Sequence, residues 1–383
     1  MSPVAAGGPV KAMIMAAGLG TRLYPLTRTT PKPMVPVAGR PVMQHMLDLL
    51  VRHGVAEVAA NLHYYPEQIT DCFGDGSASG VKLHFNYEEE LLGTAGGVGA
   101  FRELFSEGTF LVMSGDGLTG ADLTAFVAAH RRSGGIASLA VKRVADTSQY
   151  GVVVADGDGR ITGFQEKPAP EDALSDVANT GIYAFEPAIF EYIPAGEFVD
   201  WAKDVFPALL TDGAPFHRWV LDAYWNDVGD LVQYRNGNVD ALTGRVDVQL
   251  PGRRLPGDVW VGDGARIDVA AEVTGPAVIG AGCVVEAGAR LAGPLVLGAG
   301  CVVEPGAVLD GVIGWDGVVA GCDAQVSGSI LGSAVRVEHD AVVHDDVVLG
   351  AGCSVAAHVT VPAGSRLEPR TSYGPDGPEP AAS

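Results

Sequence analysis

The sequence has few basic residues compared with its acidic ones. Only 25 lysines and arginines stand against 46 aspartates and glutamates, which gives a formal net charge of −21. Proteins that bind nucleic acids or anionic membranes present a basic surface, so we expect neither kind of partner. An anionic ligand must therefore meet a local group of cations, or a metal ion, in an otherwise acidic protein.

Cysteines and long apolar runs are also scarce. The five cysteines are odd in number and form no CxxC pair, which favours reduced thiols in the cytoplasm over a disulfide framework. No apolar run reaches the roughly 20 residues of a membrane-spanning helix. The opening MSPVAAGGPVKAM lacks the basic start and apolar core of a secretion signal. We expect a cytoplasmic protein.

The length of 383 residues is enough for two domains. Residues 10–245 alternate between strand-like and helix-like stretches, which predicts an α/β domain with a mainly parallel sheet covered by helices. The expected strands lie at 10–18, 55–63, 81–89, 110–116 and 136–144, and the expected helices at 41–54, 66–74, 93–104 and 122–135. Ligands of such sheets bind beyond the carboxyl ends of the strands.

From about residue 256 the pattern changes to one aliphatic residue in every six. The positions are Val261, Ile267, Val273, Ile279, Val285, Leu291, Leu297, Val303 and Leu309, and after a slip through 310–335 they resume at Val337, Val343, Leu349, Val355 and Val361. This hexapeptide period predicts a three-sided parallel β-helix over 256–365. The tail 366–383 is rich in proline and glycine, and we predict that it is disordered.

The segment AAGLGTRLYPLTRTTPKP at 16–33 combines a bare backbone with fixed positive charge. Gly18 and Gly20 let main-chain N–H groups approach anionic oxygens. Arg22 and Lys32 add cations, and the prolines around Lys32 stiffen its position. The spacing matches neither a Walker A loop nor a dinucleotide-binding G-x-G-x-x-G motif. The segment predicts a phosphate site.

The motif series resembles that of the sugar-1-phosphate nucleotidyltransferases. The resemblance rests on MAAGLGTRLYPLTRTTPKPMVPV, GTAG at 93–96, SGD at 114–116, EKP at 166–168, NTGIYAFEP at 179–187 and WNDVGD at 225–230. It is closest to the mannose-1-phosphate guanylyltransferases that carry a C-terminal left-handed β-helix. It implies a Rossmann-like catalytic domain over 10–245 that joins a nucleoside triphosphate to a sugar 1-phosphate and releases pyrophosphate, with Mg²⁺ as cofactor.

The resemblance also implies a set of site residues. Arg22, Lys32 and Lys167 are the expected catalytic cations, and Asp116 and Asp227 the expected metal ligands. The expected nucleotide-binding residues are Ala16, Ala17, Gly18, Gly20, Thr21, Arg22, Glu88, Gly93 and Thr94. The expected sugar-phosphate-binding residues are Gly151, Glu166, Lys167 and Asn179.

Glu88 is the residue that bears on the choice of base. It stands five residues before Gly93, where the family often has a side chain that faces the base edge. A carboxylate only accepts hydrogen bonds, and guanine offers two adjacent donors. We therefore predict GTP as the donor, and the resemblance implies mannose 1-phosphate as the acceptor. The competing interpretation is that Glu88 is one of three solvated acids, Glu88–Glu90.

Several alternatives stay open. Gly120 and Asp230 depart from the family pattern, so the acceptor could be glucose 1-phosphate or a cyclitol phosphate, with another nucleotide. The chain could be a silent regulatory subunit that senses nucleotide sugars. A further alternative is an additional acyltransferase activity, which three histidines of the β-helix suggest: His339, His344 and His358. We expect the β-helix to assemble the chain into a homo-oligomer.

Overall fold

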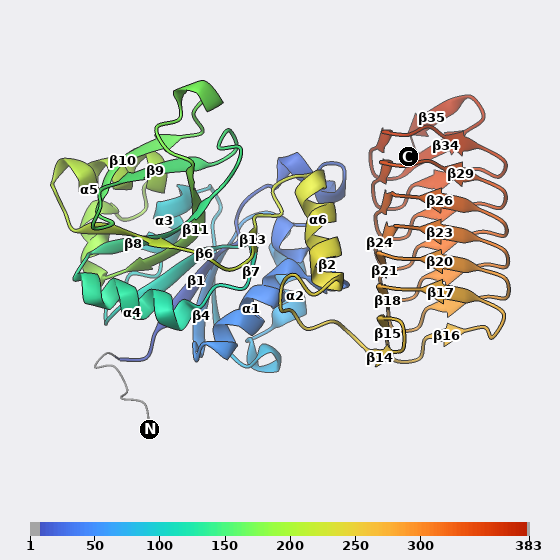
Figure 1. Cartoon of the computed structure of the whole chain (residues 1–383), viewed down its shortest axis with the longest axis horizontal. Helices are drawn as coiled ribbons and strands as arrows, with labels where there is room; N and C mark the ends of the chain where they lie inside the picture. Colours follow the sequence, from blue (N-terminus) through green and yellow to red (C-terminus); the bar gives the residue numbers. More distant parts are fainter. Residues whose placement is uncertain (1–7, 381–383) are drawn as a thin grey trace. The chain divides into compact units, whose positions relative to one another are not determined.

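A computed structural model describes residues 8–380 of the chain. Its residues form two compact units (Figure 1). The first contains the chain up to Gly18 together with Met46–Asp227, and the second contains Leu19–His45 and the chain from Val228 onward. The segment with Arg22 and Lys32 therefore belongs to the same unit as the C-terminal repeats, a division that the sequence pattern did not suggest.

The first unit is built on a mixed nine-stranded sheet. In its parallel half the strands pair in the order β6-β1-β4-β5. In its other half, β11 pairs antiparallel with β6, with β8 and with β9. The strands are β1 (Lys11–Met15), β4 (Glu57–Leu62), β5 (Lys82–Tyr87), β6 (Phe110–Ser114), β8 (Ala137–Arg143), β9 (Gly151–Ala155), β10 (Ile161–Glu166), β11 (Val177–Phe185) and β12 (Phe216–Val220). The predicted α/β architecture is confirmed.

Helices cover this sheet, as the alternating sequence pattern predicts. The helices of the chain are α1 (Val42–Arg52), α2 (Pro66–Phe73), α3 (Gly93–Gly99), α4 (Leu123–Ser133), α5 (Phe206–Thr211) and α6 (Leu231–Leu242). Helix α4 packs on β8, β11 and β12, and α3 contacts β1. Every strand and helix expected between residues 10 and 144 is present, with ends that differ by a few residues. No helix in the described part of the chain is long and apolar enough to cross a membrane.

Aromatic rings fill much of the core of the first unit. Phe105 and Phe110 stack with ring centroids 4.5 Å apart, and Phe185 stacks on Trp201 at 4.6 Å. Such pairs add about 1 kcal/mol to the burial of their apolar surface. The core thus fixes β6 and β11, the two strands whose ends carry the SGD turn and the NTG segment.

The C-terminal part of the second unit is a parallel β-helix of three sheets. The first sheet contains β14 (Arg253–Leu255), β15 (Val259–Val261), β18 (Ala277–Ile279), β21 (Leu295–Leu297), β24 (Ile313–Gly314), β27 (Ile330–Leu331), β30 (Val348–Leu349) and β33 (Arg366–Leu367). The second contains β16 (Arg266–Ile267), β19 (Val284–Val285), β22 (Val302–Val303), β25 (Val319–Ala320), β28 (Arg336–Val337), β31 (Ser354–Val355), β34 (Thr371–Gly374) and β35 (Gly377–Pro380). The third contains β17 (Glu272–Thr274), β20 (Arg290–Ala292), β23 (Val308–Asp310), β26 (Gln325–Ser327), β29 (Val342–Val343) and β32 (Thr360–Val361).

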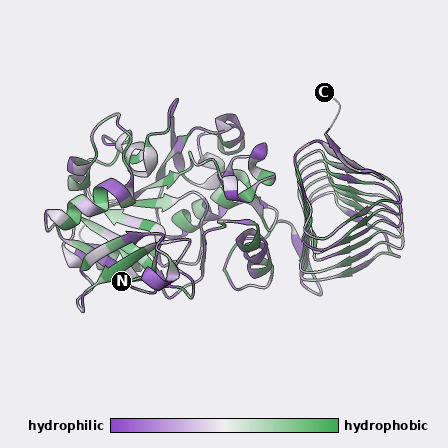
Figure 2. Ribbon diagram, turned by 90° about the horizontal axis from the view of Figure 1, so that it is seen from above, coloured by the Kyte–Doolittle hydropathy of each residue, from purple (hydrophilic) through white to green (hydrophobic). Residues whose placement is uncertain are grey.

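Successive coils of the β-helix lie over one another, and their aliphatic residues form its core (Figure 2). Val285 pairs with Val303 eighteen residues on, but Val303 pairs with Ala320, which is only seventeen residues further. The next coil, from Ala320 to Val337, is also one residue short. These two short coils explain why the aliphatic period of the sequence slips through 310–335.

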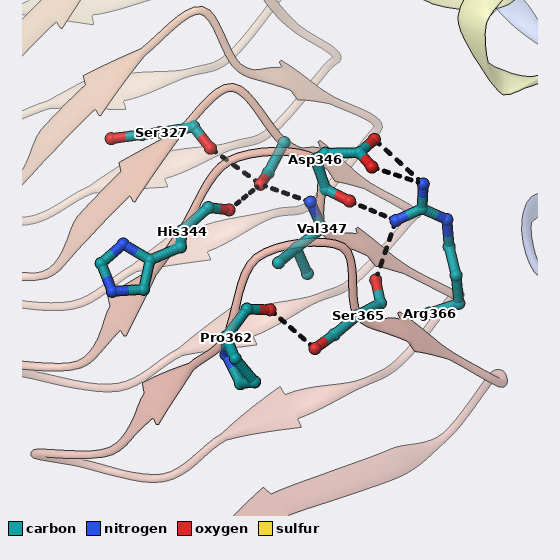
Figure 3. A network of polar contacts seen from close by, with 8 residues as sticks. Ser327, His344, Asp346, Val347, Pro362, Ser365 and Arg366 are labelled. Carbon is teal, nitrogen blue, oxygen red and sulfur yellow. Dashed lines mark hydrogen bonds and ion pairs between the residues drawn. The ribbon is translucent and has the colours of Figure 1, made fainter.

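Polar contacts tie the corners of neighbouring coils (Figure 3). The hydroxyl of Ser329, which is fully buried, lies 2.8 Å from the carbonyl oxygen of Ser327 and 2.7 Å from that of His344. The guanidinium of Arg366 donates to both carboxylate oxygens of Asp346, at 2.9 and 3.0 Å. Such contacts satisfy polar groups at the corners, where the strand ladders are interrupted.

The predicted disorder of the tail is wrong for the residues that the structure describes. Leu367 in β33 pairs with Leu349 of the coil below, so the β-helix continues past residue 365. Strands β34 and β35 then form an antiparallel hairpin that ends the stack. The prolines and glycines of this stretch belong to a capping hairpin. Residues 381–383 lie outside the described part of the chain.

Candidate active site

The carboxyl ends of β1 and β6 lie side by side in the first unit. Met15, the last residue of β1, pairs with Ser114, the last residue of β6. The N–H of Gly115 donates to the carbonyl oxygen of Met15 at 2.9 Å. A Cβ at Gly115 would lie 2.4 Å from this oxygen, so no larger residue fits there. The turn 16–18 and the SGD turn therefore begin next to each other, as predicted.

The turn after β1 presents backbone that a ligand could approach. Ala16 and Ala17 are buried, whereas Gly18 is exposed. Apart from its two chain neighbours, no atom of residues 8–380 lies within 4 Å of the position that a Cβ on Gly18 would take. Open space beside a bare backbone is what an anionic ligand requires of such a turn.

Strand pairing brings together the two chain segments that carry the predicted metal ligands. Strand β7 (Leu118–Thr119) pairs antiparallel with β13 (Trp225–Asn226), with Asn226 opposite Leu118. One further step of this register sets Asp227 opposite Gly117, the residue after Asp116. Both side chains are half-buried, and Oδ1 of Asp227 is buried from solvent. The donor chemistry of two carboxylates fits Mg²⁺, which prefers oxygen ligands.

Three neighbouring strands carry the predicted sugar-phosphate residues. Glu166 of β10 pairs with Gly151 of β9. On the other side of β9, Val152 pairs with Ala178 of β11, so the antiparallel register sets Asn179 beside Gly151. The structure therefore places Glu166, Gly151 and Asn179 in one row across the sheet.

Lys167 ends this row of strands in an uncommon backbone conformation. Its φ is 44°, a region that side chains other than glycine seldom occupy. Its N–H donates to the carbonyl oxygen of Tyr150 at 3.2 Å, which holds the turn. Its Nζ lies 3.6 Å from Oε1 of Glu166, and both side chains are exposed, so water screens the pair. The cation can exchange this weak partner for a phosphate.

The side chain of Asn179 shapes the irregular part of β11. Its Oδ1 accepts from the N–H of Gly181 at 3.1 Å, and its Nδ2 donates to the Tyr183 hydroxyl at 2.9 Å. Burial raises the pKa of Tyr183, so this phenol stays protonated. The carbonyl oxygen of Thr180 accepts from Nε1 of Trp225 at 3.1 Å. This bond joins the NTG segment to β13, next to Asp227. Trp225 opens the WNDVGD motif, but nothing in the motif indicates this contact.

Glu88 follows β5 directly and is buried, with 3% of its surface exposed. Its Oε1 accepts from Nδ2 of Asn61 at 2.7 Å, and its Oε2 accepts from the N–H of Leu92 at 2.9 Å. Oδ1 of Asn61 in turn accepts from the N–H of Ala16 at 2.9 Å. Glu88 is therefore no solvated acid, and it is linked to the turn after β1. Asn61 lies 27 residues before Glu88, and no motif marks it.

Residues 199–201 cover the start of α3, where GTAG lies. Oγ1 of Thr94 donates to Oδ2 of Asp200 and accepts from the N–H of Trp201, each at 2.9 Å. The N–H groups of Ala95 and Gly96 both donate to the carbonyl oxygen of Val199. The Thr94 side chain is thus held by Asp200, another residue that the sequence analysis missed. Backbone N–H groups at Gly93 and Thr94 stay the predicted base contacts.

The remaining predicted residues lie in the second unit. Gly20 has a φ of 65°, and a Cβ there would lie 3.0 Å from Cβ of Lys32. The carbonyl oxygen of Gly20 accepts from Oγ1 of Thr27 at 2.8 Å. Lys32 is buried, whereas Arg22 and its neighbour Thr21 are exposed on a short 3₁₀ turn, η1 (Thr21–Leu23). The segment therefore holds Lys32 against Gly20, as the prolines suggested.

The structure shows the surroundings of Asp230 and of two β-helix histidines, the residues that raised alternative functions. The carboxylate of Asp230 accepts from the N–H of Gln233 at 2.8 Å and so caps α6. His339 and His358 are exposed at two neighbouring corners of the β-helix, where both flank Asp340. The difference from the family pattern at residue 230 is thus explained by the role of Asp230 as the N-terminal cap of α6.

Comparisons with known proteins identify both parts of the chain. The nucleotidyl transferase family model matches residues 11–244, and the model of the GMPPB C-terminal domain matches residues 255–352. A UTP–glucose-1-phosphate uridylyltransferase of Synechocystis is 41% identical over 70% of this chain and 73% of its own length. A mannose-1-phosphate guanylyltransferase of Mycobacterium tuberculosis is 36% identical over 70% of this chain and 74% of its own length.

Solved structures share the fold of the first part. HddC from Yersinia pseudotuberculosis, solved in complex with GMP-PN, has a TM-score of 0.53 and 26% identity, and the match covers 60% of this chain and 98% of HddC. A Bacillus anthracis structure named as a putative glucose-1-phosphate thymidylyltransferase has a TM-score of 0.57 at 23% identity, with 63% of this chain and 97% of that chain covered. Because the family model spans more than half of the sequence, this chain belongs to the nucleotidyl transferase family and is a sugar-1-phosphate nucleotidyltransferase.

Proposed function

We propose that this enzyme joins GTP to mannose 1-phosphate, releasing pyrophosphate and forming a guanosine-diphosphate sugar. The observation that supports this most is the GMPPB C-terminal domain that follows the catalytic region in the same chain. Two relatives whose names include mannose-1-phosphate guanylyltransferase are 36% and 33% identical to this chain. The buried carboxylate of Glu88 adds an acceptor next to the turn after β1.

The second candidate is a reaction of UTP with glucose 1-phosphate. It is favoured by the relative at 41% identity, whose printed name gives that activity. Both candidates use the same chemistry, because only the base and the sugar differ. With either sugar, the carboxylate of Glu166 can accept hydrogen bonds from sugar hydroxyls, and the amide of Asn179 can both donate and accept.

The proposed mechanism follows from the charges of the named residues. Lys167 holds the phosphate of the incoming sugar, and Glu166 and Asn179 orient the sugar through its hydroxyls. An oxygen of that phosphate attacks the α-phosphorus of the nucleotide in line, and the bond from the α-phosphorus to the bridging oxygen of pyrophosphate breaks. Arg22 and Lys32 stabilise the charge that builds on the leaving pyrophosphate. Orientation supplies much of the rate, because no proton transfer is needed.

Asp116 and Asp227 would hold the Mg²⁺ ion of this reaction. When bound, Mg²⁺ neutralises phosphate charge and acts as a Lewis acid on a phosphoryl oxygen. The backbone N–H groups at Gly18, Gly93 and Thr94 would face the nucleotide, together with Ala17 and the side chain of Thr21. The cytoplasmic location stays a prediction from the cysteines, all five of which are free thiols.

The proposed function is tested by measuring pyrophosphate release with Mg²⁺ across four nucleoside triphosphates and a panel of sugar 1-phosphates. We expect the highest kcat/KM with GTP and mannose 1-phosphate. A maximum with UTP and glucose 1-phosphate would select the second candidate and leave the mechanism intact. Turnover with no pair would contradict the catalytic proposal and favour the regulatory alternative.

Replacing either metal ligand should abolish most of the activity. A Lewis acid contributes several kcal/mol of transition-state stabilisation, so we expect Asp116→Asn and Asp227→Asn each to lower kcat at least about 100-fold. Asp222→Asn removes an exposed acid nearby and serves as the control. Steady-state rates over a Mg²⁺ titration would decide: wild-type kcat in both variants would exclude these two residues as ligands.

Glu88→Gln should weaken the preference for GTP. Both carboxylate oxygens accept N–H groups, from Asn61 and from Leu92, and an amide can offer only one oxygen to them. The other N–H would then face an NH₂ group in a buried place, which costs about 1–3 kcal/mol. This internal cost applies with either nucleotide, whereas the loss of a carboxylate acceptor for the two guanine donors applies to GTP alone. We therefore expect kcat/KM for GTP to fall about tenfold or more, with a smaller change for UTP.

Glu89→Gln is the matched control, because Glu89 is the exposed neighbour of Glu88. Its ratio of kcat/KM values for GTP and UTP should equal that of the wild type. An unchanged ratio in Glu88→Gln would show that this carboxylate has no part in choosing the base.

We further propose that the β-helix supports a homo-oligomer. Its long stack of coils offers broad faces and an end hairpin for a second copy. Light scattering at micromolar protein concentration should give at least twice the 39.5 kDa of the chain. A monomer mass would rule out this assembly.

A further inference from the structure

A buried chain of hydrogen bonds runs from the β-helix to the segment that carries Lys32. Trp315, which follows β24, donates from its Nε1 to the hydroxyl oxygen of Tyr234 at 2.8 Å. Tyr234 lies on α6 and donates from its hydroxyl to the carbonyl oxygen of Pro36 at 2.8 Å. Pro36 stands four residues after Lys32, in β2 (Pro36–Val37). All of these residues belong to the second unit.

Burial makes this chain energetically important. Tyr234 is fully buried, and Trp315 is only 4% exposed. Burial raises the pKa of Tyr234, so its phenol keeps its proton and remains a donor to Pro36. Because one hydroxyl bonds to both the indole N–H and the Pro36 carbonyl, its loss would leave the buried indole N–H and the half-buried carbonyl without this partner.

A second side chain of α6, one helical turn further, holds the same segment. Oδ1 of Asn238 accepts from the N–H of Ala38 at 2.8 Å, and its Nδ2 donates to the carbonyl oxygen of Tyr234 at 2.9 Å. Ala38 has a φ of 49°, which is rare for a residue with a Cβ. Its turn connects β2 to β3 (Arg40–Pro41). Asn238 therefore supports a strained turn that the segment needs to double back.

A second contact between this segment and the β-helix is weaker. Arg28 donates from Nε and Nη2 to the two carboxylate oxygens of Glu368, at 3.0 and 3.3 Å. These side chains are 45% and 59% exposed, so water and salt screen their attraction. The buried contacts of Tyr234 and Asn238 therefore hold the segment more firmly than the ion pair does.

We propose that Trp315, Tyr234 and Asn238 are positioning residues for the nucleotide. They hold the segment from Lys32 to Ala38 in the conformation in which Lys32 meets the triphosphate. The proposal rests on the role of Arg22 and Lys32 in the proposed function. It gives the β-helix a part in binding the nucleotide, in addition to any part in assembly.

The ordinary alternative is that these residues only stabilise the second unit. The two ideas differ in what they predict for the two substrates. A residue that positions the cation segment affects the nucleotide, whereas the sugar phosphate meets Lys167, Glu166 and Asn179 of the first unit. A loss of general stability lowers the amount of active enzyme and changes neither KM.

The test compares Trp315→Phe with Trp260→Phe, the same change at a half-buried tryptophan of β15. Trp315→Phe keeps an aromatic ring but removes the N–H that orients Tyr234. We expect the KM for the nucleoside triphosphate to rise about three- to tenfold, since one net hydrogen bond contributes about 1 kcal/mol. The KM for the sugar phosphate should stay within twofold, and Trp260→Phe should match the wild type in both.

Hydrogen exchange gives a readout that needs no turnover. In Tyr234→Phe and Trp315→Phe, amides of residues 34–40 should exchange faster, while those of β1 keep the wild-type rate. Equal shifts in both KM values, or no shift with unchanged exchange at 34–40, would overturn the proposal. If the wild type turns over no substrate pair, the proposed function fails, yet the exchange result still shows whether Trp315 and Tyr234 hold the segment.

Discussion

The candidate site depends on the close approach of two backbones at the carboxyl edge of the sheet. The N–H of Gly115 donates to the carbonyl oxygen of Met15, and a side chain at Gly115 would collide with that oxygen. This contact fixes the SGD turn next to the turn after β1. Asp116 directly follows Gly115, and the pairing of β7 with β13 brings the segment before Asp227 next to the residues that follow Asp116. The glycine at 115 is thus a condition for the SGD turn to lie beside the end of β1.

The sequence predicted the parts of the fold that local patterns control. Buried apolar runs marked β1 and β6 correctly, because a strand covered on both faces has no polar positions. The predicted disorder of the tail was wrong because it rested on proline and glycine content, and composition does not show which residues pair with a neighbouring coil. Leu367 continues the column of Leu349, and that single aliphatic residue was the signal for a further coil.

Contacts between distant residues explain what the sequence could not reveal. Glu88 stands beside two acids that are exposed, and nothing local distinguishes it from them. Its burial comes from Asn61, on another strand of the sheet. In the same way, the membership of 19–45 in the second unit depends on α6, about 200 residues later. Spacing within a motif carries no information about such partners.

The net charge of −21 explains why the placement of each charged group in the proposed site matters. A nucleoside triphosphate and a sugar phosphate both bring negative charge to an acidic protein. Four of the proposed site residues are themselves carboxylates, namely Glu88, Asp116, Glu166 and Asp227. A divalent ion would turn Asp116 and Asp227 from a repulsive pair into an attractive centre. The few cations must then lie where phosphate charge is greatest. Buried hydrogen bonds such as those of Tyr234 and Asn238 hold the segment of Lys32 more firmly than an exposed ion pair does, because water and salt screen exposed charges.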